Sequence, residues 1–233
     1  MIEDLLTPLV CQRYLTDVHY REWYLHVLHP KPGTIVLGLH MPEVKHIAKN
    51  LSKKKCWHNL LHDFSVASAA LSHDERMVWG LMLNYVDCSL EERLCLIDAF
   101  LPAVDNWAIC DNFCCNAKWI EQSDKQQVWH WIYQQMKVTA EFQRRVPIVL
   151  AMNHYLGPDT MDITLQAISN MNLREGEPYY VQMAVAWLLA TALAKDGATT
   201  RAFVNAARLP NDIVKRYIRK ARESRITKTI APL

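Results

Sequence analysis

The amino-acid sequence predicts an all-α protein. Only 6 of its 233 residues are glycine, and runs of β-branched residues are few. Apolar residues recur three and four positions apart, as on one face of a helix, and Val78, Leu81, Met82 and Tyr85 form one such series. With 51% hydrophobic and 21% charged residues, the chain can bury a large core. Its length favours a single domain over residues 1–233.

The front of the chain is expected to form short helices around a proline-rich break. Helices are predicted over about residues 2–15 and 17–28. The segment His29–Gly33 contains two prolines and a glycine, so it is predicted to be non-helical. Pro42 stands in the first turn of the next helix, where a proline sacrifices no hydrogen bond, and that helix runs to about Leu51.

The later helices follow a regular spacing. They are expected to open near Asp74, Asp105, Thr139 and Pro178, so the openings are 31, 34 and 39 residues apart by subtraction. This period is typical of HEAT-like helix-pair repeats, which stack into a curved α-solenoid. The partner helices and the final helix are predicted over about residues 90–101, 124–136, 159–171, 199–207 and 211–222.

Trp107 and Asp111 are four residues apart on the helix that opens at Asp105 or Asn106, so they share one face. Both Asp and Asn are good helix caps. A buried indole beside a solvated carboxylate is the simplest interpretation of such a pair. The position of Trp107 and Asp111 within the repeat allows a second interpretation of the pair.

Equivalent positions on successive repeats line one surface, usually the concave one. Asp111 and Arg145 each lie six residues after the opening of their helix, and Trp187 lies nine after. We therefore expect Trp107, Asp111, Arg145 and Trp187 to converge on one groove. A carboxylate, a guanidinium and two indoles are not required for packing helices together, so the groove is a candidate functional site.

A basic cluster lies in the last helix and the tail. The formal net charge is only +2, so any affinity for nucleic acid must come from a local patch. Arg216, Arg219 and Lys220 fall on one side of the helix. They form either a solvated end of the fold or a contact with the phosphate backbone, which would be independent of sequence and sensitive to salt. The full cluster is Lys215, Arg216, Arg219, Lys220, Arg222, Arg225 and Lys228.

Neither the cysteines nor the histidines form a recognisable metal motif. Cys110, Cys114 and Cys115 lack the paired C-x-x-C spacing of structural zinc. His58 and His62 have ligand spacing, but no glutamate follows His58 to make the H-E-x-x-H motif. We expect no metal, and we expect reduced thiols in a cytoplasmic protein.

The chain also lacks the signs of a membrane protein or a secreted one. No apolar run reaches the length of a membrane span, and the first residues are acidic where a signal peptide is basic. We therefore expect a protein that does not enter the membrane.

Four motifs in order resemble the AlkD-type DNA alkylation repair family. The similarity covers most of the chain, from about Tyr20 to the end. Members of that family are HEAT-like repeat proteins, and the founding members are N-alkylpurine DNA glycosylases. The motifs are DNWAICD (105–111), QRRVPIVL (143–150), MAVAWLLATALAK (183–195) and KARESRI (220–226).

The resemblance implies roles for the groove residues. Trp107, Asp111 and Trp187 match the residues that contact the deoxyribose of the damaged nucleotide without flipping its base, and Arg145 matches an arginine that holds the backbone. Loss of an N3- or N7-alkylated purine leaves an oxocarbenium-like sugar. Indole faces attract cations, and a fixed carboxylate stabilises developing positive charge. No cofactor is required.

The sequence departs from the family pattern at two places. The front resembles a shorter branch, in which His29–Gly33 takes the place of an aromatic and basic helix that grips DNA. Ala190 stands where active members tend to carry an arginine. Because the groove residues match the family and these two places do not, two functions stay open. The chain is either a monofunctional DNA glycosylase for N3- and N7-alkylpurines, or a non-catalytic DNA-binding or interaction protein of the same family. In either case we expect a monomer that binds double-stranded DNA weakly through the phosphate backbone, with low sequence specificity.

Overall fold

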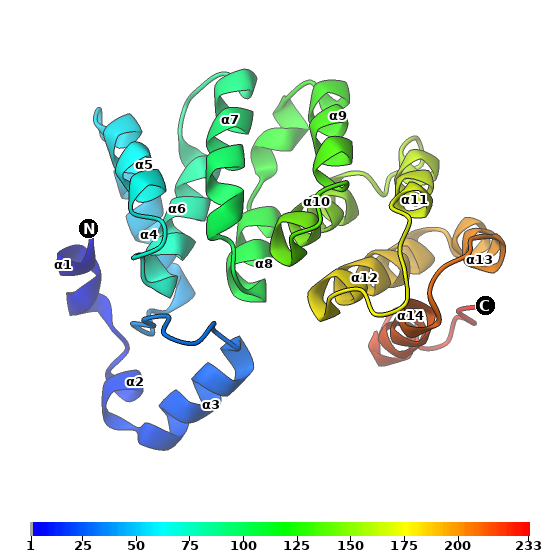
Figure 1. Cartoon of the computed structure of the whole chain (residues 1–233), viewed down its shortest axis with the longest axis horizontal. Helices are drawn as coiled ribbons and strands as arrows, with labels where there is room; N and C mark the ends of the chain where they lie inside the picture. The colour runs from blue at the N-terminus through cyan, green and yellow to red at the C-terminus, as the bar shows by residue number, and fades with distance from the viewer. Residues whose placement is uncertain (1) are drawn as a thin grey trace. The chain divides into compact units, whose positions relative to one another are not determined.

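The computed structural model describes residues 2–233, and every regular element in that range is helical (Figure 1). An isolated antiparallel bridge between Val10 and Leu39 is the only β pairing in the described range. The predicted all-α class is therefore confirmed. The chain separates into two compact units, one up to Trp119 and one from Ile120 to Leu233. The single domain over residues 1–233 stays a prediction.

The first unit contains the front helices, one complete helix pair of the predicted repeat and the first helix of the next pair. Serine side chains fix two of its helix starts: Ser72 accepts from the Glu75 N–H and Ser89 from the Glu92 N–H, which satisfies donors that a helix start leaves free. The helices are α1 (Glu3–Leu6), α2 (Gln12–Thr16), α3 (Val18–Leu28), α4 (Met41–Ser52), α5 (Trp57–Val66), α6 (His73–Tyr85), α7 (Leu90–Phe100) and α8 (Trp107–Cys115).

The single helix predicted over residues 2–15 is wrong. After α1 the chain forms a short 3-10 helix (Thr7–Leu9), and Val10 is then extended before α2 begins. Val10 pairs with Leu39, and the Cys11 N–H donates to the Gly38 carbonyl at 3.3 Å. A backbone pairing with a segment almost thirty residues away therefore interrupts a stretch whose local pattern is helical.

Residues 29–40 contain no helix, so the prediction of a non-helical His29–Gly33 segment is confirmed. The segment is held against the start of α6 because the Asp74 carboxylate accepts from the Leu37 N–H at 2.7 Å and the Leu39 N–H at 3.0 Å. Gly38 has a φ of +82°, and a Cβ there would lie 2.4 Å from the ring of Tyr14. Only glycine fits this position.

The second unit continues the helix pairs. Its helices are α9 (Lys125–Gln135), α10 (Glu141–His154), α11 (Met161–Asn170), α12 (Tyr179–Lys195), α13 (Gly197–Ala206) and α14 (Asn211–Glu223). Across both units, the first helices of the pairs were predicted near 74, 105, 139 and 178, and their caps are Ser72, Asn106, Ala140 and Pro178. The predicted partner helices are found within about two residues of the expected bounds.

In both units, the first helices of consecutive pairs pack on each other. In the first unit α4 packs on α6 and α6 on α8, and in the second unit α10 packs on α12 and α12 on α14. At one junction in each unit, an arginine four residues after the cap links a first helix to the residue before the cap of the next one. Arg76 on α6 pairs with Asp105 before α8, and Arg144 on α10 pairs with Glu177 before α12. The same ion pair thus recurs at the same register.

Aromatic side chains fill the cores of both units. Trp79, Phe100 and Phe113 are buried in the first unit, and Tyr155 and Tyr217 in the second. Within residues 2–233, no helix is both long and apolar enough to cross a membrane.

Candidate nucleic-acid site

The start of α8 is fixed by a buried asparagine. Asn106 is the cap, and its side-chain oxygen accepts from the Ala108 N–H at 3.0 Å and the Ile109 N–H at 3.2 Å. Trp107 is therefore the first residue of the helix, and Asp111 follows one turn later. Both side chains are half-buried, whereas Ala108, Ile109 and Cys110 between them point into the core. The spacing argument correctly places Trp107 and Asp111 on one partly exposed face.

A hydrogen bond across the fold orients the Trp107 indole. Its Nε1–H donates to the Val27 carbonyl, at the end of α3, over 3.1 Å. This contact joins residues 80 positions apart in the sequence, so periodicity gives no sign of it. The hydrogen bond fixes one edge of the indole. It also places the end of α3 beside the face of α8 that carries Trp107.

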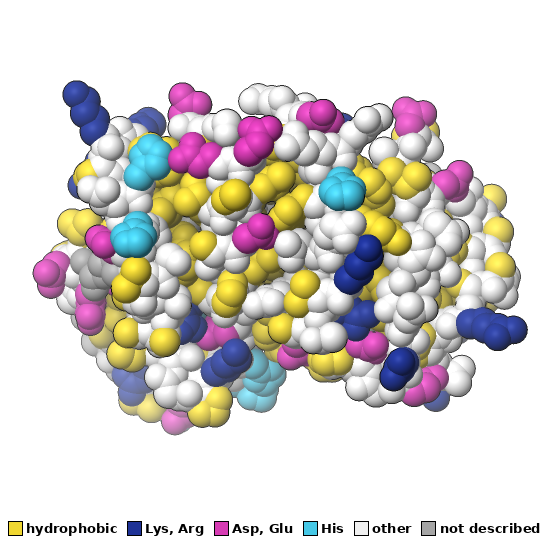
Figure 2. All heavy atoms as spheres, turned by 45° about the horizontal axis from the view of Figure 1, so that its top comes forward, with side chains coloured by type: hydrophobic (Ala, Val, Ile, Leu, Met, Phe, Trp, Pro, Cys, Tyr) yellow, Lys and Arg dark blue, Asp and Glu magenta, His cyan; other side chains and the backbone are white. Residues whose placement is uncertain are grey.

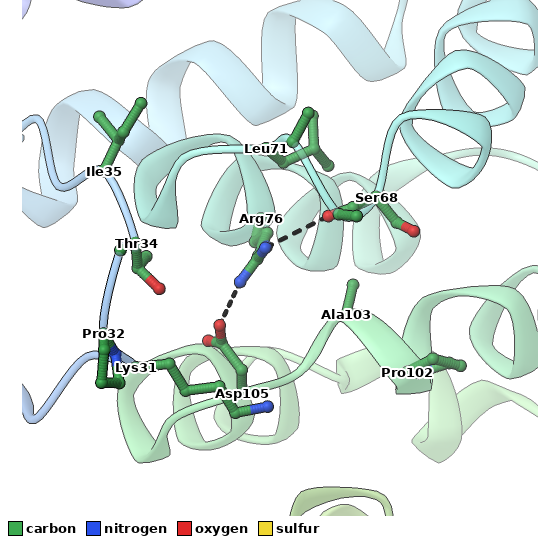
Figure 3. A pocket seen from close by; sticks show the side chains of 13 residues that line it. Lys31, Pro32, Thr34, Ile35, Ser68, Leu71, Arg76, Pro102, Ala103 and Asp105 are labelled. Carbon is green, nitrogen blue, oxygen red and sulfur yellow. Dashed lines mark hydrogen bonds and ion pairs between the residues drawn. The ribbon is translucent and has the colours of Figure 1, made fainter.

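A buried polar network lies behind the start of α8. Arg76 bonds the Asp105 carboxylate and also donates to the Ser68 carbonyl at 3.2 Å, as Figure 3 shows. Asn106 Nδ2 contacts Asp105 Oδ1 at 2.9 Å and the His73 ring at 3.1 Å. Burial lowers the pKa of His73 more than the nearby carboxylates raise it. The network is thus a neutral histidine, an amide and one ion pair.

The pocket in Figure 3 is part of this network. It has a volume of about 560 Å³ and lies between the 31–35 segment and the loops before α6 and α8. The charged groups on its wall are Lys31, Arg76 and Asp105. Because Arg76 and Asp105 bond each other, and Arg144 forms the equivalent ion pair with Glu177, we assign Arg76 a structural role.

Arg145 is buried in the second unit. Only 4% of its surface is exposed. Its Nη1 donates to the Tyr180 carbonyl at 2.9 Å, and its guanidinium carbon lies 5.8 Å from the centre of the Tyr180 ring. The structure places it in the packing between α10 and α12. Its predicted contact with a DNA backbone stays a prediction.

Trp187 lies on α12 and is half-buried. It lines a pocket of about 330 Å³ together with residues from the end of α14, including Lys220 and Glu223. The indole therefore faces α14, the helix that carries the basic cluster. The packing of α12 against α14 brings the two together.

Arg216, Arg219 and Lys220 lie together, as their helical spacing predicts. They line one pocket of about 180 Å³ with Tyr179 and Met183 of α12. Figure 2 shows that on the face in view the Lys and Arg side chains are scattered singly, which agrees with the small net charge. The grouping beside α12 is therefore a local feature.

Partners from α12 and α14 hold the three basic side chains. Arg216 Nε donates to Gln182 Oε1 at 2.6 Å, and its guanidinium carbon lies 4.7 Å from the centre of the Tyr179 ring. Glu223 accepts from Arg219 at 2.8 Å and lies 3.9 Å from Lys220. The sequence pattern did not identify Tyr179, Met183 and Glu223 as members of this group. The four-residue spacing of Tyr179, Met183 and Trp187 was the available signal.

The predicted convergence of the four groove residues involves both units. Trp107 and Asp111 belong to the first unit, and Arg145 and Trp187 belong to the second. The convergence stays a prediction. Within single units, the structure brings Trp107 beside Asp111 and Trp187 beside the α14 cations.

The cysteines and histidines do not gather into a metal site in the described residues. No group of three or more His, Cys, Asp or Glu side chains in residues 2–233 is arranged to hold a metal ion. Cys110 and Cys114 are buried, and burial raises the pKa of the Cys114 thiol. His58 bonds Glu92 of α7 at 3.1 Å.

Comparison with known families gives one match. The family model described as DNA alkylation repair enzyme matches residues 22–229, which is most of the chain. Neither the curated proteins nor the solved structures gave a significant match.

Proposed function

Since the chain belongs to the DNA alkylation repair enzyme family, we propose that it is a monofunctional DNA glycosylase that removes N3- and N7-alkylated purines from double-stranded DNA. The observation that carries the proposal is the face of α8. Its buried cap and the Val27 contact fix Trp107, and Asp111 lies one turn away on the same half-exposed face.

The chemistry requires stabilisation of a cationic sugar. When the bond between C1′ and an alkylated purine breaks, the bonding electrons leave with the base, which becomes neutral, and positive charge develops on the deoxyribose. The Asp111 carboxylate stabilises that charge, and the indoles of Trp107 and Trp187 attract it. Water then adds to C1′ and loses a proton, and Asp111 orients that water. Because the base is already a good leaving group, no strong general acid is needed.

We further propose that the helix pairs are HEAT-like repeats stacked into one α-solenoid. The consecutive packing of first helices in each unit supports this proposal, as does the recurrence of the Arg76–Asp105 ion pair as Arg144–Glu177. Such stacking places equivalent positions on one surface. It would bring Trp107, Asp111 and Trp187 to one groove.

The contact with DNA is assigned to the basic residues beside α12. Arg216, Arg219 and Lys220 would contact backbone phosphates, which carry no sequence information. Glu223 offsets part of their charge, so the binding is expected to be weak. Because few phosphates are neutralised, the logarithm of affinity should fall shallowly with the logarithm of salt concentration.

A single-turnover excision assay tests the proposal. Duplex DNA containing 7-methylguanine or 3-methyladenine is incubated with excess protein, and the released base and the abasic site are both measured. We expect release from both lesions and none from unmodified guanine or adenine. If the protein binds the duplex but releases neither base, the chain is not a glycosylase.

One observation favours a second function, a non-catalytic DNA-binding protein of the same family. Arg145, which matches the backbone-holding arginine of glycosylases, is 4% exposed and donates to the Tyr180 carbonyl. An arginine used in packing is less available to a phosphate. Binding without excision in the same assay is the result that this function predicts.

A further inference from the structure

A pocket of about 470 Å³ lies between two loops of the second unit. One loop joins α11 to α12 and the other joins α13 to α14, and Figure 1 shows the two loops running side by side. The volume is within the range of small-ligand pockets in proteins. The residues assigned above to chemistry and to DNA contact belong to other surfaces. The main lining residues are Ser169, Leu173, Arg174, Arg208 and Leu209.

The wall of this pocket carries positive charge. Its charged residues are Arg174 from the first loop and Arg208 from the second. Both side chains are exposed, and among residues 2–233 neither forms an ion pair with a carboxylate. A guanidinium group presents a rigid set of donors that matches carboxylate and phosphate oxygens. Two such groups on one pocket therefore favour an anion as the ligand.

The carboxylates of the same two loops make other contacts. Glu177 pairs with the buried Arg144 at 2.7 Å. Glu175 accepts from backbone N–H groups at the start of α14, and Asp212 accepts from the Gly176 N–H at 3.2 Å. In the described part of the chain, the pocket wall includes none of these three acids. An anion in the pocket would thus meet the two arginines and no carboxylate on the wall.

These contacts also hold the two loops in place. Arg144 donates to the Met171 carbonyl at 2.8 Å where the first loop begins, and it pairs with Glu177 where that loop ends. The hydrogen bonds of Glu175 and Asp212 tie the first loop to the second. The backbone that carries the two pocket arginines is therefore fixed before a ligand arrives, so binding costs little ordering of the loops.

The rest of the pocket suits a small organic group attached to the anion. Ile168 is buried on its floor, and Leu173 and Leu209 are half-buried there. Ser169 and Asn172 add a hydroxyl and an amide. A phosphate ion alone would not fill this space, whereas a phosphate joined to a pentose would. The carbon atoms of the sugar would contact the leucines, and its oxygen atoms would meet the hydroxyl and the amide.

We propose that this pocket binds a sugar phosphate, with the phosphate between Arg174 and Arg208. The same chemistry occurs in the backbone of DNA and in free sugar phosphates. With DNA as the source, the pocket is a contact additional to Arg216, Arg219 and Lys220, and the inference then rests on the proposed function in taking DNA as the ligand. With a free sugar phosphate as the source, the pocket is independent of DNA.

Two binding measurements on wild type and on the pocket variant, Arg174→Gln with Arg208→Gln, separate these sources. Calorimetric titration with ribose 5-phosphate, and with ribose as a control without phosphate, tests the free ligand. If that is the source, wild type binds ribose 5-phosphate but not ribose. The pocket variant then loses at least about tenfold of the affinity, as expected for hydrogen bonds to a charged group, and binds duplex DNA as wild type does.

Fluorescence anisotropy with an unmodified duplex, over a range of salt concentrations, tests DNA as the source. In that case the pocket variant binds the duplex about tenfold more weakly at low salt. The slope of the logarithm of affinity against the logarithm of salt concentration then decreases by about one, which is the share of one phosphate contact.

A charge control accompanies the pocket variant. Lys118→Gln with Lys195→Gln removes two positive charges from exposed positions outside the pocket and should leave both affinities unchanged. The inference is overturned if the pocket variant binds both probes as wild type does, if wild type binds neither probe, or if the control variant loses as much affinity as the pocket variant.

Excision of alkylated bases is a separate result. A protein that excises them, but whose pocket variant binds both probes as wild type does, would overturn the pocket alone. A protein that excises nothing, but whose pocket variant loses affinity for either probe, would support the pocket and count against the glycosylase.

Discussion

Asp111→Asn is expected to lower the single-turnover rate of 7-methylguanine release by about 100- to 1,000-fold, the effect of removing one preorganised charge-stabilising group from an active site. The amide keeps the shape of the side chain but removes the negative charge. The cationic sugar then loses its main electrostatic partner. The rate is measured by chromatography of the released base, with protein in excess over DNA.

A control for charge accompanies this variant. Asp63→Asn changes an exposed carboxylate of α5, so it alters the net charge equally and should leave the rate unchanged. If Asp111→Asn excises as fast as wild type, Asp111 has no part in the chemistry. A rate lost equally in both variants would assign the effect to net charge.

Arg76→Met is expected to lower the free energy of unfolding by about 3–5 kcal/mol, because it leaves a buried carboxylate without its partner. The side chain of Asp105 is 6% exposed and that of Arg76 is 10% exposed. Asp105 also bonds Asn106, the cap of α8, so the change reaches the helix that carries Trp107. Urea unfolding followed by circular dichroism gives the change in free energy.

Two further variants show whether the buried charge is the cause. Arg76→Met combined with Asp105→Asn removes both charges and should recover much of the loss. Arg13→Met breaks an exposed ion pair with Asp17 and should have little effect, since exposed pairs contribute little. A single Arg76→Met variant as stable as the Arg13→Met variant would contradict the assigned role of the Arg76–Asp105 pair.

Local signals were sufficient to predict most of the helices. Ser, Asn and Pro at helix starts act on neighbouring backbone groups, so Asn106 and Pro178 could be placed without knowledge of the fold. Helical spacing likewise put Trp107 with Asp111, and Arg216 with Lys220. These relations lie within one or two turns of a single helix.

The same local signals do not predict contacts between segments that are far apart in the sequence. The break at Val10 depends on Leu39, and the orientation of Trp107 depends on Val27. The burial of Arg145 follows from α12 packing over α10. In each case the deciding partner comes from another helix or loop, and residue spacing does not identify it.

We propose that Trp107 and Asp111 together stabilise the positive charge that develops on the deoxyribose. The most direct test compares the binding of two duplexes, one with a cationic pyrrolidine in place of the sugar and one with a neutral tetrahydrofuran. Because a catalyst binds a transition-state mimic more tightly than a neutral analogue, we expect the pyrrolidine duplex to bind at least about tenfold more tightly to wild type, and Asp111→Asn to lose this difference. Equal affinity of the wild-type protein for the two duplexes would contradict the claim.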